Sequence, residues 1–102
     1  MGASRPVAVG EDGRVQRERI RVTGVVQGVG FRASVARAAE SRGLAGWIRN
    51  CADGTVEAVF EGGEADVEAL SRYCEYGSRG ANVIRVESFD EEPEGLDAFE
   101  VR

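Results

Sequence analysis

Two glycines and an arginine, Gly28, Gly30 and Arg32, have the spacing expected of a site for one phosphate group. They lie where an alternating strand, residues 20–26, runs into the start of a predicted helix. Glycines let backbone N–H groups approach a ligand, and a helix N-terminus adds partial positive charge. Arg32 adds a planar guanidinium whose forked donors match phosphate oxygens. The spacing therefore predicts an anion site, although the glycines alone would suit an ordinary tight turn equally well.

The residue types that are missing narrow the chemistry of this site. All 13 basic residues are arginine, so the lysine of a nucleotide P-loop is absent, as is a G-x-G-x-x-G run. The predicted site should therefore hold a single phosphate group. The chain also has no histidine, which is the usual acid–base group near neutral pH and the commonest metal ligand. Any chemistry here has to proceed without it.

Asn50 is the second candidate, because it places an amide at the end of a short strand, directly before a loop. The following pair, Asp53 and Gly54, is a strong signal for a tight turn between two strands. A turn asparagine that hydrogen-bonds its own backbone is the alternative, and spacing alone leaves it open. The other carboxylates, including Glu57, Glu61 and the run 90–94, are interpreted as solvated, because no pair has a spacing that suggests catalysis.

The whole chain has the composition of one ordinary globular domain of 102 residues. Residues 1–18 show no sustained period and are predicted to be a flexible, dispensable leader, which leaves 19–102 as the domain. The net charge of −5 argues against a broad nucleic-acid surface, and no stretch is apolar enough to span a bilayer. Cys51 and Cys74 are expected to be free thiols, with Cys74 in the core. These features favour the cytoplasm.

Hydrophobic periodicity predicts an α+β fold. The expected order is β-α-β-β-α-β plus a short terminal strand, with Ile84 and Val86 of the fourth strand pointing inward. This is the pattern of a ferredoxin-like sandwich, in which two helices cover one face of an antiparallel sheet of four to five strands. The predicted strands are 20–26, 47–50, 55–61, 82–89 and 98–102, and the predicted helices begin at Phe31 and Glu64 and end at Gly43 and Gly77.

Two separated blocks of the sequence closely resemble the signature blocks of the acylphosphatases. The first is Val-Gln-Gly-Val-Gly-Phe-Arg at 26–32, and the second is Gly-Trp-Ile-Arg-Asn at 46–50 followed by Asp-Gly-Thr-Val-Glu at 53–57. The resemblance covers residues 20–102 with matched order and spacing. Two features depart from the family pattern. A glycine-rich segment, 77–80, stands where many relatives have a proline-rich turn, and the leader is longer than the family needs.

The resemblance implies a small monomeric enzyme that hydrolyses acyl phosphates to a carboxylate and inorganic phosphate, without metal or cofactor. By position, Arg32 matches the family's phosphate-binding arginine, and Asn50 matches its water-orienting asparagine. Thr55 matches a position that often carries a hydroxyl, which gives it a supporting role at best. The expected partner is a small acyl phosphate, and neither nucleic acid nor a membrane. The implied substrate-binding residues are Gln27, Gly28, Val29, Gly30, Phe31 and Arg32.

An acyl phosphate suits a chain without histidine, because its leaving carboxylate has a pKa of about 4 to 5 and needs no protonation. The rate then comes from positioning and charge stabilisation. Three alternatives stay open at this point. They are the front module of a larger protein that handles carbamoyl phosphate, although the chain ends at Arg102; an RNA-binding sheet, although the strand aromatics lack the usual pairing; and an anion-binding protein without catalysis.

Overall fold

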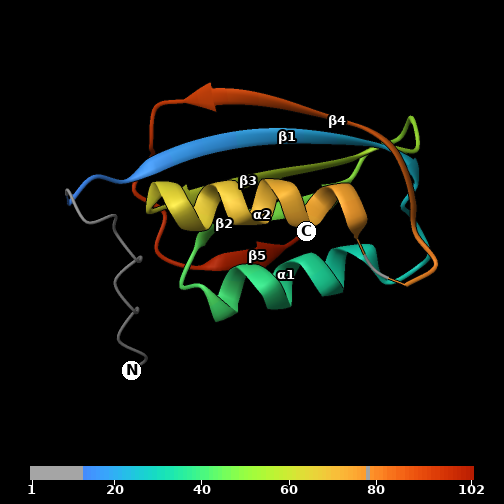
Figure 1. Cartoon of the computed structure of the whole chain (residues 1–102), viewed down its shortest axis with the longest axis horizontal. Coiled ribbons are helices and arrows are strands. Elements are labelled where there is room, and N and C mark those ends of the chain that lie inside the picture. Colours follow the sequence, from blue (N-terminus) through green and yellow to red (C-terminus); the bar gives the residue numbers. More distant parts are fainter. Residues whose placement is uncertain (1–12, 78) are drawn as a thin grey trace.

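The computed structural model describes residues 13–77 and 79–102, which form five strands and two helices (Figure 1). All the elements expected from the sequence are present, and α2 begins with two acidic residues, Glu64 and Asp66, whose charge suits a helix N-terminus. Neither helix in this described part is long and apolar enough to cross a membrane. The elements are β1 (Gln16–Val25), α1 (Phe31–Ser41), β2 (Ala45–Asn50), β3 (Val56–Gly62), α2 (Glu64–Tyr76), β4 (Asn82–Glu91) and β5 (Phe99–Val101).

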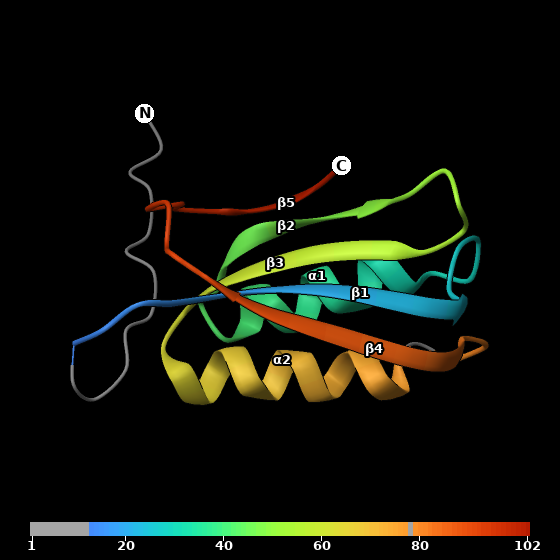
Figure 2. The same cartoon turned by 90° about the horizontal axis from the view of Figure 1, so that it is seen from above.

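The five strands form one sheet in the order β4-β1-β3-β2-β5 (Figure 2). Strands β1 to β4 pair with one another in antiparallel orientation, whereas the short β5 runs parallel to β2. Both helices pack on one face of the sheet and contact each other (Figure 1). This arrangement confirms the predicted ferredoxin-like α+β sandwich. The sheet is mixed rather than wholly antiparallel, because of β5.

The hydrophobic core lies between the sheet and the two helices. Alternate strand residues such as Ile20, Ile48 and Phe60 are fully buried there. Cys74 is a core residue, as predicted, and burial raises the pKa of its thiol. Both cysteines are free thiols. The helices contribute apolar stripes made of Phe31, Val35 and Ala39 in α1 and of Val67, Leu70 and Cys74 in α2.

Strand β1 begins at Gln16 rather than at the expected residue 20. Its first residues pair with the end of β3, where Gln16 lies opposite Gly62. The predicted leader of 1–18 is therefore wrong at its C-terminal end. The strand was hidden in the sequence because Glu18 lies on the same face as Ile20 and Val22 and puts a charge where the apolar alternation expects a core residue. Its carboxylate accepts a hydrogen bond from Ser71 of α2. Residues 1–12 of the predicted leader lie outside the described residues, so its dispensability stays a prediction.

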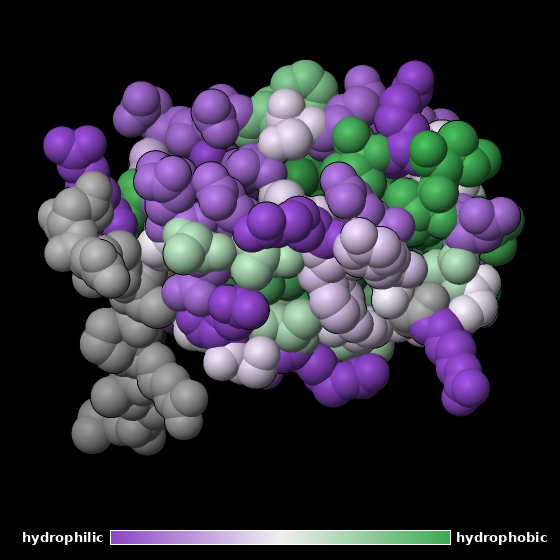
Figure 3. Space-filling view, viewed as in Figure 1, coloured by the Kyte–Doolittle hydropathy of each residue, from purple (hydrophilic) through white to green (hydrophobic). Residues whose placement is uncertain are grey.

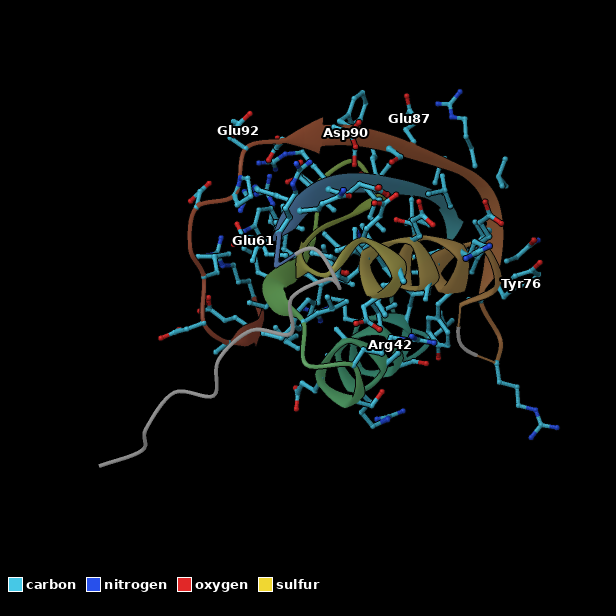
Figure 4. The ribbon with its side chains drawn as sticks, turned by 60° about the vertical axis from the view of Figure 1, so that its left-hand side comes forward. Arg42, Glu61, Tyr76, Glu87, Asp90 and Glu92 are labelled. Atoms are coloured by element: carbon cyan, nitrogen blue, oxygen red, sulfur yellow. The ribbon has the colours of Figure 1, made fainter. Side chains whose placement is uncertain are left out.

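Glu57 and Glu61 are buried, which contradicts their interpretation as solvated residues. They lie on the face of β3 that points away from the helices, as the alternation predicted. That face is covered as well, because Arg17 forms an ion pair with Glu61 at 2.7 Å and Arg19 forms one with Glu57 at 3.1 Å. Figure 4 shows Glu61 within the body of the molecule and Glu92 at its outer edge.

Ile84 does not point inward as expected, but is 75% exposed. The pairing of β1 with β4 shifts here, because Thr23 lies opposite Arg85 and Gly24 opposite Val83, so that Ile84 is the extra residue of a β-bulge in β4. Because strand side chains alternate between faces, this shift leaves Ile84 outside, while Val83 and Val86 pack against the core. Figure 3 shows the result as a group of hydrophobic side chains near the end of β1 and the start of β4, on an otherwise largely hydrophilic face.

Candidate active site

A cleft of about 200 Å³ opens at the N-terminus of α1. Gly28 and Gly30 each have a φ of 75°, a left-handed conformation that turns the chain sharply from β1 into the helix. Gly30 is the N-cap of α1, and no side chain caps the first turn. The first amides of a helix have no partner within the helix, so this end suits an anion. The cleft is lined by Val26, Gly28, Gly30, Phe31, Arg32, Ala33 and Val101.

Arg32 lies in the first turn of α1 and reaches across to the end of the chain beyond β5. Its Nη1 donates a hydrogen bond of 2.6 Å to the main-chain oxygen of Arg102. The amide of Arg102 in turn donates to the carbonyl of Ile48 in β2, at 2.8 Å. A guanidinium carries five N–H donors, so this contact anchors Arg32 while leaving donors for a ligand in the cleft.

Asn50 is the last residue of β2, two residues beyond Ile48 and so at the same end of the sheet as the contact made by Arg32. Its Oδ1 is buried and accepts no hydrogen bond from any described residue. The neighbouring turn is closed by Asp53, whose Oδ1 accepts a 3.0 Å hydrogen bond from the amide of Thr55. The structure thus brings Arg32 and Asn50 to one end of the sheet and leaves the Asn50 oxygen available as an acceptor.

Gln27 and Thr55 make their side-chain contacts with the hairpin turn between β2 and β3. The Nε2 of Gln27 donates to the carbonyls of Cys51 at 2.8 Å and of Thr55 at 2.9 Å. The Thr55 hydroxyl donates to Asp53, and the bonds from Thr55 lower the pKa of Asp53. Thr55 therefore supports the turn. Sequence reasoning placed Gln27 in the phosphate loop but missed its side-chain contact, because a bond to a residue 24 positions away leaves no local pattern.

The family model of the acylphosphatases matches residues 18–101 of this chain. The chain belongs to the acylphosphatase family. An acylphosphatase of Haloarcula marismortui is 54% identical over 86 residues, which cover 84% of this chain and 94% of that relative. A solved acylphosphatase structure from Coxiella burnetii is similar with a TM-score of 0.85 and 33% identity, covering 89% of this chain and 96% of that one. The solved acylphosphatase structure from Bacillus subtilis is similar with a TM-score of 0.83 and 36% identity, covering 85% of this chain and 98% of that one.

Among the described residues that line the cleft of this acylphosphatase, Arg32 is the one that carries a positive charge. Other arginines close to the end of β2 are bound to carboxylates instead. Arg49 donates to Glu57 at 2.8 Å, and its guanidinium lies over the ring of Trp47. Burial alone would raise the pKa of Glu57, but the hydrogen bonds from Arg49 and Arg19 outweigh burial and lower it. Within the described residues, no group of three or more potential metal ligands occurs.

Proposed function

We propose that this acylphosphatase hydrolyses acyl phosphates to a carboxylate and inorganic phosphate in the cleft at the start of α1. Arg32 and the backbone amides of residues 27–32 hold the phosphoryl oxygens, and Asn50 orients the attacking water. The observation that carries the role of Asn50 is its buried Oδ1, which accepts no hydrogen bond from a described residue. A buried oxygen of this kind needs a donor, and the attacking water would supply one by donating a hydrogen to Oδ1 when the substrate is bound.

The reaction asks the side chains for position and charge rather than for proton transfer. The leaving group is a carboxylate with a pKa of about 4 to 5, so it departs without a proton. Water held by Asn50 attacks phosphorus in line with the leaving oxygen, and the bond between phosphorus and the acyl oxygen breaks. Arg32 and the loop amides stabilise the charge on the phosphoryl oxygens. One of those oxygens accepts the proton that the water loses.

Phosphate release from benzoyl phosphate, measured in the presence of a metal chelator, tests this function. We expect Arg32→Ala and Asn50→Ala each to lower kcat/KM by about 100- to 1,000-fold, because each removes one preorganised polar contact with the reacting groups. Arg37→Ala is the matched control, since Arg37 is an exposed arginine on the same helix, and it should retain wild-type turnover. Wild-type turnover by either Arg32→Ala or Asn50→Ala would contradict the assignment.

We also propose that the protein acts as a monomer in the cytoplasm on a small acyl phosphate, and that it binds neither nucleic acid nor membranes. The two free thiols suit a reducing compartment, and the net charge of −5 opposes a phosphate backbone. Light scattering after size exclusion should give the mass of one chain, 10.9 kDa. Filter binding with single-stranded RNA should give no retention. The mass of a dimer, or retained RNA, would overturn the corresponding part of this proposal.

A further inference from the structure

We propose that the side chain of Gln27 is a positioning residue that fixes the phosphate loop relative to Asn50. This inference rests on the function proposed above, which assigns phosphate binding to residues 27–32 and water orientation to Asn50. Gln27 is the first residue of that loop, and its Nε2 donates hydrogen bonds to the carbonyls of Cys51 at 2.8 Å and Thr55 at 2.9 Å. Both carbonyls belong to the hairpin turn that follows Asn50. One amide group thus joins the two halves of the site.

The turn that Gln27 binds is already closed by its own backbone. The amide of Cys51 donates to the carbonyl of Thr55 at 2.8 Å, and the amide of Gly54 donates to the carbonyl of Cys51 at 3.1 Å. The two N–H hydrogens of Gln27 therefore add a second bond to each of these carbonyls and span the turn. Cys51 directly follows Asn50, so any displacement of the Cys51 peptide displaces Asn50 as well.

These contacts separate the side chain of Gln27 from the groups that bind phosphate. Both of its N–H donors are used by the turn, and its remaining polar atom, Oε1, is an acceptor that suits no phosphate oxygen. The side chain instead holds the phosphate loop in a fixed position relative to the hairpin turn. In-line attack requires the water and the phosphorus at a fixed separation, and a misplacement of about 1 Å can lower a rate by about 100-fold.

The first test is Gln27→Met, which keeps the length of the side chain and removes both donors. The turn carbonyls keep their bonds from the Cys51 and Gly54 amides, so the variant should fold, as circular dichroism would show. We expect kcat for benzoyl phosphate to fall by about 10- to 100-fold. The inhibition constant of inorganic phosphate should change by less than about threefold, because the loop that holds phosphate is intact. If Gln27→Met does not fold, Gln27→Asn is the second variant. It carries the two donors on a side chain one methylene shorter, and we expect the same fall in kcat and the same small change in the inhibition constant.

The other glutamine of the chain, in β1, provides a matched control. Gln16 lies at the opposite end of the strand, where its Nε2 donates a single bond of 3.2 Å to Glu64 on the exposed surface. Gln16→Met removes a glutamine hydrogen bond between β1 and another element without touching the site, and its kcat should equal that of the wild type. A fall in kcat as large as that of Gln27→Met would overturn the inference, because the effect would then not depend on the turn beside Asn50.

A double-mutant cycle separates positioning from a general structural effect. Once the Asn50 amide is removed, Gln27 has no water-orienting group left to position. Adding Gln27→Met to Asn50→Ala should therefore lower kcat by less than about threefold. An equal loss in both backgrounds, or wild-type kcat in Gln27→Met, would overturn this inference while leaving the roles of Arg32 and Asn50 intact. Wild-type turnover by Asn50→Ala would overturn the proposed function itself, and this inference with it.

Discussion

Glu61 is a carboxylate with no exposed surface, and its oxygens accept hydrogen bonds from two directions. Arg17 donates through Nη1 at 2.7 Å, and three consecutive amides, those of Glu94, Gly95 and Leu96, donate at 2.8, 3.2 and 3.0 Å. Burial alone would raise the pKa of Glu61, but the bonds from the Glu94 amide and from Arg17 outweigh burial and lower it. This one residue ties the end of β3 to the segment that leads into β5.

Replacing Glu61 should therefore destabilise the fold strongly. Glu61→Ala removes the acceptor of three amides and one partner of the buried Arg17 guanidinium, so we expect the free energy of unfolding to fall by about 3 kcal/mol or more. Urea unfolding followed by the fluorescence of Trp47 measures this change. Glu92→Ala, at an exposed carboxylate of the same acidic segment, should change stability by less than about 0.5 kcal/mol. Similar losses in the two variants would show that burial of Glu61 is not what matters.

At the scale of elements, β2 is the strand on which the site is assembled. It pairs with β3 on one side and β5 on the other, and it ends in Asn50. Gly46 allows this close fit, because its φ is 138° and a Cβ there would lie 1.8 Å from the carbonyl oxygen of Val59. The amide of Gly46 also donates to the carbonyl of Ala98, directly before β5, at 3.0 Å. A displacement of β2 would therefore move Asn50 and β5 together.

Gly46→Ala should consequently cost about 3 kcal/mol or more in the free energy of unfolding, because the added methyl group meets a main chain that cannot move without breaking strand pairing. Gly80→Ala separates this overlap from the cost of a positive φ. Gly80 has a φ of 91° and open space where a Cβ would lie, so that variant should lose only about 1 kcal/mol. Thermal unfolding of both proteins provides the comparison, and equal losses would rule out the overlap as the cause.

At the scale of the whole molecule, the charges make stability sensitive to acid but not to pH near neutrality. The pKa values of Asp53, Glu57, Glu61 and Glu91 are lowered in the folded protein, from ordinary values of 3.8 for aspartate and 4.5 for glutamate. A carboxyl with a lowered folded pKa contributes stability that is complete above its unfolded value and is lost as the pH falls through its folded value. The chain has no histidine that would titrate in between.

We therefore expect the free energy of unfolding to be level between about pH 8 and 6 and to decline steadily below about pH 4.5. Urea titrations at a series of pH values would measure this profile. A decline that begins above about pH 6, or stability that is unchanged at about pH 3, would contradict the assigned direction of these pKa shifts.

Local patterns in the sequence were enough to predict the elements, their order, and the places of Arg32 and Asn50 at the ends of elements. Contacts between distant residues were not predictable in this way. The pair of Arg17 and Glu61, 44 positions apart, buries two charges that look solvated when each is considered alone. A β-bulge in β4, where the strand pairs with Thr23 and Gly24 of β1, likewise turns Ile84 outward, and the alternation of β4 alone does not indicate it.

The division of work between Arg32 and Asn50 is the central claim, and the binding of inorganic phosphate to two variants tests it most directly. Isothermal titration calorimetry should give Asn50→Ala the Kd of the wild type, because the loop amides and Arg32 remain. The Kd of Arg32→Ala should rise by about tenfold or more, because that variant loses a charge-assisted contact with phosphate. Wild-type affinity in Arg32→Ala, or an equal loss of affinity in Asn50→Ala, would contradict the account.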